Sequence, residues 1–294
     1  MSVAPSASGG APAEGAAPRR PAPPRRRNQW RTAIRPTIIS VLSVLFVFGA
    51  LGWWVTSAEM WPQVRLQFFN LDAMIAAFPG VLRGFGVSVS IWLSALVGIG
   101  VWALVLAIVR SLRAPWFTPF RLMVVIYIDI FRGIPVLLLV LLFGFGIPAL
   151  NLPGLPNSGL FWGAVAMILS YSAYVAEIYR SGIDAVHEGQ WAASKSLGLS
   201  EWQTMVYAVL PQALRNVLPA LMNIVVALQK DVALLSVIGV RDAVREAQIY
   251  TAQTFNYSSL IVAAALFMAA TIPMARLADY VTRKDRERRL QRAG

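Results

Sequence analysis

Residues 171–211 read YSAYVAEIYRSGIDAVHEGQWAASKSLGLSEWQTMVYAVLP, a polar stretch between long apolar runs. It contains the only histidine of the chain, His187. It also holds six charged side chains, namely Glu177, Arg180, Asp184, Glu188, Lys195 and Glu201. Because charged side chains are costly in lipid, this stretch is expected to lie in water between membrane-spanning segments.

Two short helices are predicted within this stretch. The first covers about residues 189–197 and ends at Gly198, because glycine readily adopts the left-handed conformation that closes a helix. The second begins at Ser200, where Gln203 three positions later predicts a capping box. It is expected to end before Pro211, whose ring interrupts the helical hydrogen-bond ladder.

The composition places the chain in a membrane. Its 294 residues are 57% hydrophobic and 14% charged, whereas soluble domains are about 45–50% apolar and about 25% charged. Residues 36–58 contain no charge, and a helix of that length crosses the roughly 30 Å hydrocarbon layer. We therefore expect an all-α integral membrane protein.

The net charge of +12 is concentrated beside apolar runs. Seven arginines lie within residues 19–35, and seven lysines or arginines lie within residues 276–292. This is the positive-inside pattern, so both termini are expected in the cytoplasm, and nucleic-acid binding is not expected. The sequence has no cysteine, which excludes disulfides and thiolate sites.

Six spans are expected between these basic flanks. Residues 1–35 are interpreted as a disordered basic cytoplasmic tail, and residues 36–57 as a retained transmembrane helix rather than a cleaved signal peptide. The other spans are expected near residues 83–110, 120–146, 159–178, 215–240 and 257–277. Outer-face segments are expected at 58–82, 147–158 and 241–256, and a basic cytoplasmic tail at 279–294.

Two of these spans carry charges, which are unusual in lipid. The third contains Asp129 and Arg132, and the nearby Gly133 and Pro135 predict a kink. The fifth is interrupted by the adjacent pair Lys230–Asp231. Charged or irregular membrane segments persist where protein or a water-filled cavity surrounds them, so both places are candidates for a solute path.

The 171–211 stretch resembles the cytoplasmic coupling loop of ABC importer permeases. The pattern of that family is Glu-Ala-Ala, three residues, Gly, nine residues, and then Ile-x-Leu-Pro. The corresponding residues here are Ala192–Ala193–Ser194, Gly198, Ala208, Leu210 and Pro211. Ala192 and Ala208 depart from the Glu and Ile of the pattern.

Four flanking sequences are similar to the polar amino-acid uptake subfamily of these permeases. They are AEIYRSGIDAVHEGQ (176–190), in which His187 and Glu188 are variable positions, LPQALRNVLPALMN (210–223), FRGIP (131–135) and KDVALLSVIGV (230–240). The resemblance covers about residues 80–278. It implies a type I ABC importer permease fold, in which a five-helix core at 80–278 carries a cytoplasmic coupling loop at 180–211, with one added N-terminal transmembrane helix here.

The resemblance also implies a role and partners. The chain would be a permease subunit that translocates an amino acid or related small polar solute across a bacterial cytoplasmic membrane. Its partners would be two cytoplasmic ABC ATPase subunits, a second permease chain, identical or paralogous, and an extracytoplasmic solute-binding protein. ATP and Mg would bind the ATPase subunits, so no cofactor and no enzymatic activity are expected in this chain.

The coupling loop supplies the first set of candidate site residues. By resemblance, the residues that contact the ATPase are Glu188, Gly189, Gln190, Ala192, Ala193, Gly198, Leu210 and Pro211. Trp191 or Trp202 is expected to anchor that contact. The alternative is that the charged residues of this loop are simply a solvated helix face.

The intramembrane polar residues supply the second set. Candidates for the solute path are Asp129, Arg132, Asn223, Lys230 and Asp231. A dehydrated zwitterion needs a partner for each of its charges, and opposite charges at an interrupted helix meet that need. The alternative is that the four charged residues pair with one another and only hold the helices together.

Several positions have lost polarity relative to the subfamily, namely Ile134, Leu139, Ile224, Val232 and Ala233. One interpretation is that the solute is less polar than usual for the subfamily. The other is that this chain pairs with a paralogous permease that keeps the polar groups. The absence of Glu at Ala192 favours the second interpretation.

Two rival classes of function stay open at this point. One is a stand-alone secondary transporter or channel, which inverted repeats or a proton-relay chain would favour. The other is a membrane scaffold without transport. The sequence shows no HExxH motif, Walker glycine loop or nucleophile elbow, so no enzymatic class is favoured.

Overall fold

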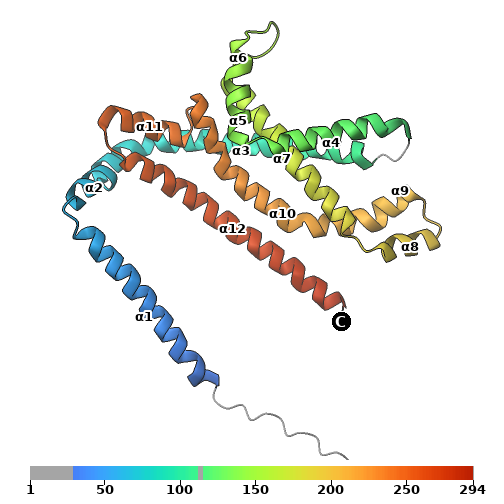
Figure 1. The fold of residues 1–294 in the computed structure, drawn as a ribbon, viewed down its shortest axis with the longest axis horizontal. Helices are drawn as coiled ribbons and strands as arrows, with labels where there is room; N and C mark the ends of the chain where they lie inside the picture. Colours follow the sequence, from blue (N-terminus) through green and yellow to red (C-terminus); the bar gives the residue numbers. More distant parts are fainter. Residues whose placement is uncertain (1–28, 112–114, 294) are drawn as a thin grey trace, which may run out of the picture. The chain divides into compact units, whose positions relative to one another are not determined.

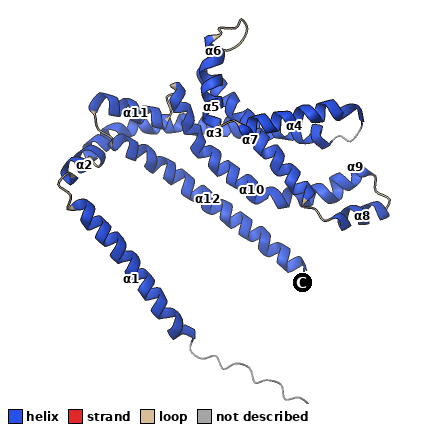
Figure 2. Ribbon diagram, in the orientation of Figure 1, coloured by secondary structure: helices blue, strands red, loops and turns tan. Residues whose placement is uncertain are grey.

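The computed structural model describes residues 29–111 and 115–293, and every regular element in these ranges is helical (Figure 2). Contacts divide the chain into two units, Met1–Trp61 and Pro62–Gly294. In the first unit, α1 spans Gln29–Thr56 (Figure 1), and its stretch Ile38–Thr56 is long and apolar enough to cross a membrane. This is the expected N-terminal helix. It begins inside the segment 1–35 that we expected to be disordered; residues 1–28 lie outside the described residues.

The next long helix begins earlier than expected. After the short α2 (Trp61–Phe68), α3 covers Leu71–Ser111, so the prediction of a span starting at residue 83 was wrong. The reason is a local cap, because the side-chain oxygen of Asn70 accepts a hydrogen bond from the backbone N–H of Ala73 at 3.1 Å. Arg83 lies within the helix and does not end it.

The third expected span is a bent pair of helices. α4 (Thr118–Gly133) and α5 (Val136–Leu141) meet at Ile134, whose backbone is extended. The two halves are bent by 100°, which confirms the predicted kink at Gly133 and Pro135. A π-helical turn (Leu142–Gly146) and the short α6 (Ile147–Ala149) continue the second half.

The helix α7 (Gly159–Asp184) lies at the centre of the second unit and packs against α3, α4, α5 and α10 (Figure 1). The main core contains Ile99 of α3, Leu139 of α5, Met167 of α7 and Leu228 of α10. Small residues let these helices approach closely. A methyl group added at Gly98 would lie 2.7 Å from the Ile168 side chain.

After residue 209 the chain forms two α-helices before its last one. α10 (Leu210–Asp231) runs without a break through Lys230 and tightens into a 3₁₀ helix at Val232–Ile238, so the expected interruption at Lys230–Asp231 is a change of helix type. α11 (Ala243–Thr254) occupies the segment expected to be an amphipathic helix.

The last helix, α12 (Ser258–Ala293), is longer than predicted. We expected a span near 257–277 followed by a separate tail, but the helix continues because the basic tail consists mostly of strong helix formers. In the described ranges, five helices are long and apolar enough to cross a membrane, or six when the α4–α5 pair counts as one span. This agrees with the six spans expected.

Candidate functional site

The predicted coupling loop, residues 180–211, forms a coupling segment with two short helices beyond the end of α7 (Figure 1). α8 covers Glu188–Ser196, and its first turn is capped by His187, whose Nδ1 accepts a hydrogen bond from the N–H of Gly189 at 3.0 Å. Gly198 follows in the left-handed conformation, with φ of +78°. The predicted helix end at this glycine is therefore confirmed.

The second helix starts where the sequence predicted. α9 covers Glu201–Gln203 and has a complete capping box. The Ser200 hydroxyl accepts from the N–H of Gln203 at 3.2 Å, and the Gln203 side chain accepts from the N–H of Ser200 at 2.9 Å. Lys195 and Glu201 form an exposed ion pair of 3.3 Å across the turn of the hairpin of α8 and α9.

The helix does not end before Pro211, so that prediction was wrong. A π-helical turn (Thr204–Val209) links α9 directly to α10. In this turn the N–H of Leu210 donates to the carbonyl of Met205, and Pro211 follows as the second residue of α10. The Gln212 side chain donates to the carbonyl of Ala208 at 3.0 Å and so satisfies a group near the proline.

All eight residues expected to contact the ATPase are exposed at the surface of the isolated chain: Glu188, Gly189, Gln190, Ala192, Ala193, Gly198, Leu210 and Pro211. Two apolar side chains accompany them, because Leu197 is 81% and Trp202 is 75% exposed. Trp191, in contrast, packs against a small core formed by Val186, Val209 and Ala213. Trp191 therefore supports the hairpin from inside, and Trp202 is the tryptophan available to a partner.

A cavity of about 520 Å³ lies beside this hairpin. It is lined mostly by apolar side chains of α3, α7 and α10, with Trp202 and Met205 at the hairpin end. An apolar lining gives a polar solute few hydrogen-bond partners. The cavity is therefore a poor candidate for the solute path.

The expected solute-path residues lie on α4 and α10. Asp129, Arg132, Asn223 and Lys230 are exposed on the isolated chain, and Asp231 is half-buried. Among the residues that the structure describes, no ion pair joins the four charged members of this set. The alternative that they pair with one another as structural links is thus not supported within the chain.

Two tyrosines that sequence reasoning missed connect these residues through α7. The Arg132 guanidinium lies 5.6 Å from the centre of the Tyr174 ring. The hydroxyl of Tyr171 donates a hydrogen bond to the Asp231 carboxylate, and the two tyrosine rings lie 6.4 Å apart. Their i, i+3 spacing, which puts them on one face of a helix, was the signal available in the sequence.

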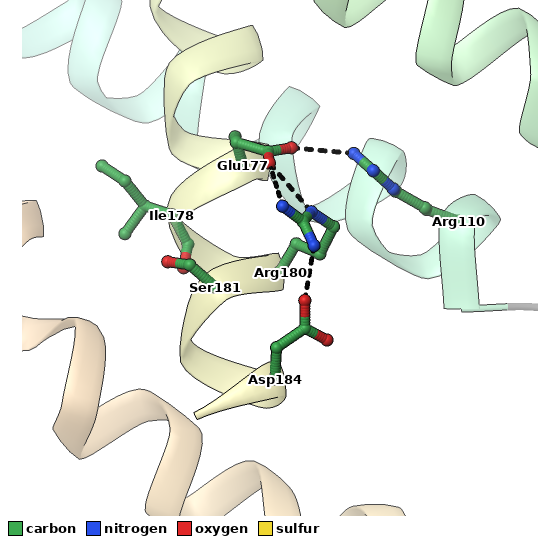
Figure 3. Close-up of polar contacts among 6 residues, drawn as sticks. All are labelled: Arg110, Glu177, Ile178, Arg180, Ser181 and Asp184. Atoms are coloured by element: carbon green, nitrogen blue, oxygen red, sulfur yellow. Dashed lines mark hydrogen bonds and ion pairs between the residues drawn. The ribbon is translucent and has the colours of Figure 1, made fainter. Parts of the chain in front are cut away.

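A second polar cluster lies where α7 leads into the coupling segment (Figure 3). The Glu177 carboxylate accepts from Arg110 of α3 at 2.9 Å and from the Nε of Arg180 at 2.8 Å. Arg180 also pairs with Asp184 at 2.5 Å. The sequence placed Arg110 in a cytoplasmic loop and gave no sign that it meets Glu177.

The family model of the binding-protein-dependent transport system inner membrane component matches residues 101–287. The chain belongs to this family. The matched range includes the coupling segment, the tyrosine pair and the charged residues of α4 and α10. This permease therefore has the type I ABC importer fold that the resemblance implied, and it is a transport subunit, not an enzyme.

Known proteins similar to the permease include two from Bacillus subtilis (strain 168). The arginine transport system permease protein ArtQ is 36% identical, over 73% of this chain and 97% of that protein. The probable amino-acid ABC transporter permease protein YckA is 32% identical, over 74% of this chain and 93% of that protein.

Solved structures agree on the fold. A chain from the crystal structure of an amino acid ABC transporter with histidines matches with a TM-score of 0.67 at 31% identity, covering 73% of this chain and 98% of that one. A chain from an inward-facing structure of the MetNI methionine ABC transporter matches with a TM-score of 0.58 at 16% identity, covering 70% and 96%. At that identity the likeness concerns the fold alone. The matches do not favour a stand-alone transporter or a scaffold.

Proposed function

We propose that the permease moves an amino acid or a related small polar solute into the cytoplasm in an ATP-driven importer. The observation that carries the proposal is the α8–α9 hairpin. Its exposed surface is held by caps at both helices, and α9 continues into α10 without a break, while only residues 185–187 separate α8 from the end of α7. A rigid projection of this kind can pass a displacement at its tip to the spans behind it.

The proposal includes partners that must meet this hairpin and the outer face. Two cytoplasmic ABC ATPase subunits bind ATP and Mg and contact the exposed hairpin, with Trp202 inserted between them and the permease. An extracytoplasmic solute-binding protein delivers the solute, and no cofactor binds this chain. Both termini and the hairpin face the cytoplasm of a bacterium, as the clustered arginines indicate.

The solute path in this proposal runs past Arg132 and Lys230 on the cationic side and Asp231 on the anionic side. A zwitterionic amino acid carries one group of each sign, and both need partners after leaving water. Tyr171 holds the Asp231 carboxylate, and Tyr174 holds Arg132 by a cation–π contact. Asp129 and Asn223 extend this polar surface toward a second permease chain.

The second permease is either identical or paralogous. The apolar residues at usually polar positions are weaker support for a paralogous partner than the sequence suggested. Leu139 and Val232 are buried in the main core, where their apolar side chains serve packing. Ala192, where the family pattern has Glu, lies exposed on α8 and still favours a paralogous partner whose own hairpin keeps the acidic group. Uptake measured after co-expression with and without that partner distinguishes the two pairings, because only the paralogous pairing needs the partner.

Reconstitution tests the proposed function. The chain is co-expressed with the ATPase subunits, purified with them and placed in lipid vesicles with the binding protein. We expect ATP-dependent uptake of an amino acid when the vesicles contain this chain and, for the paralogous pairing, its partner. Purification without any ATPase subunit, or uptake that does not need ATP, would contradict the proposal.

A further inference from the structure

A row of charged side chains joins the end of α3 to the helix that leads into the hairpin (Figure 3). Both oxygens of the Glu177 carboxylate are occupied, Oε2 by Arg110 and Oε1 by Arg180. Arg180 in turn binds Asp184 in the last turn of α7. The row therefore alternates in sign from α3 to the start of the coupling segment.

The two ends of this row differ in their exposure to water. The side chains of Glu177 and Arg110 are 21% and 26% exposed, whereas Asp184 is 59% exposed. An ion pair shielded from water interacts more strongly than one at the surface, and removing one partner leaves the other charge poorly solvated. The bond between Arg110 and Glu177, the joint between α3 and α7, is thus the better shielded end of the row, and Asp184 is its exposed outer end.

The bond between Arg110 and Glu177 is a polar contact between α3 and the part of α7 that leads into the coupling segment. On its other side α7 touches α10 directly, since a methyl group added at Gly182 would lie 2.2 Å from Val217. Toward α8 there is a cavity of about 440 Å³, which Arg110, Arg180, Glu188 and Trp191 help to line. Because this cavity separates α8 from the end of α3, α8 does not push on α3 directly. A movement of the coupling segment therefore reaches α3 through α7.

We propose that Glu177 is a positioning residue for transport. By holding Arg110 and Arg180 at once, its carboxylate makes the end of α3 follow the end of α7 when the ATPase subunits displace the hairpin. The proposal rests on the function proposed above. It predicts that breaking the joint partly separates ATP hydrolysis from uptake, because the hairpin still docks while the end of α3, then held to α7 by the apolar cluster of Leu106, Ala173 and Ala176, follows it less closely.

The test uses the complete transporter in lipid vesicles and measures the number of solute molecules taken up per ATP hydrolysed. Allosteric coupling between sites is typically worth about 5–150-fold, so Glu177→Gln is expected to lower this ratio about five-fold or more while ATP hydrolysis continues. Arg110→Gln is expected to do the same, and the double variant to lose no more, because both remove one joint. Asp184→Asn is the matched control at the exposed end and should keep the ratio.

A distance measurement keeps the proposal testable if the Gln variants fail to assemble. Because the chain has no cysteine, spin labels can be placed at Val101 on α3 and Ala185 at the end of α7. In the otherwise unmodified complex this distance should stay the same with and without trapped ATP. A changed distance, or an unaltered uptake ratio in Glu177→Gln, overturns the proposal; failure of the unmodified complex to bind ATPase subunits overturns the proposed function instead.

Discussion

Single residues decide the shape of the hairpin, and Gly198 is the clearest case. With φ at +78°, it adopts a conformation that costs a side-chain-bearing residue roughly 1 kcal/mol or more. Gly198→Glu is expected to abolish uptake, because it strains the turn and adds bulk and charge to the docking surface. Uptake by vesicles and co-purification of the ATPase subunits measure the effect together.

Gly198→Asn is the matched control for this change. Asparagine is the side-chain-bearing residue best tolerated in the left-handed conformation at a helix end, so this variant should keep most of the uptake. Normal uptake by Gly198→Glu would show that the turn does not transmit movement.

A second residue-scale prediction concerns Asp242, which is fully buried and caps α11 by accepting from the N–H of Arg245 at 2.8 Å. Burial raises the pKa of its carboxyl to about 6, above the ordinary value of about 3.9 for an unfolded chain. Between these values the folded state binds more protons than the unfolded state, so folding stability falls as the pH rises from about 4 to about 6 and is flat above.

Thermal unfolding of the detergent-solubilised permease measures this dependence. Asp242→Asn keeps an oxygen for the cap but has no proton to lose. The difference in unfolding free energy between the native chain and this variant should therefore fall with rising pH, by up to about 3 kcal/mol at 1.36 kcal/mol per pKa unit. A difference that is constant from pH 4 to pH 6 would contradict the assigned pKa.

At the scale of helices, close approach of α3 and α7 depends on Gly98. Gly98→Val places new atoms against Ile168, where even a methyl group would lie 2.7 Å away, and overpacking of this kind typically costs about 1–3 kcal/mol. Gly100 lies on the same helix with nothing within 4 Å of an added methyl. Gly100→Val should therefore unfold at nearly the native temperature, and equal losses in the two variants would contradict the packing.

The helices also show what the sequence predicted well. Signals carried by neighbouring residues, such as the capping box at Ser200 and the helix end at Gly198, were predicted correctly. The continuation past Pro211 was not, because it depends on a π-helical turn whose hydrogen bonds no local motif announces. Likewise, the joint between Arg110 and Glu177 depends on two helices meeting, which the order of residues does not state.

For the whole molecule, the proposed orientation follows from the distribution of arginine and lysine. A single cysteine at Lys195 on α8 should resist an impermeant thiol reagent in intact cells and react after the membrane is opened. A cysteine at Asn157, in the exposed turn before α7, is the matched control and should react in intact cells. The reverse pattern would invert the proposed topology.

The proposed role of the α8–α9 hairpin is to be the surface through which the ATPase subunits drive the permease. Its most direct test replaces Trp202 with a photo-crosslinking amino acid in the complete transporter. We expect a crosslink from position 202 to an ATPase subunit and none from Phe255, which is similarly exposed at the end of α11. An ATPase crosslink from position 255, or none from position 202 in a complex that still contains the ATPase subunits, would contradict it.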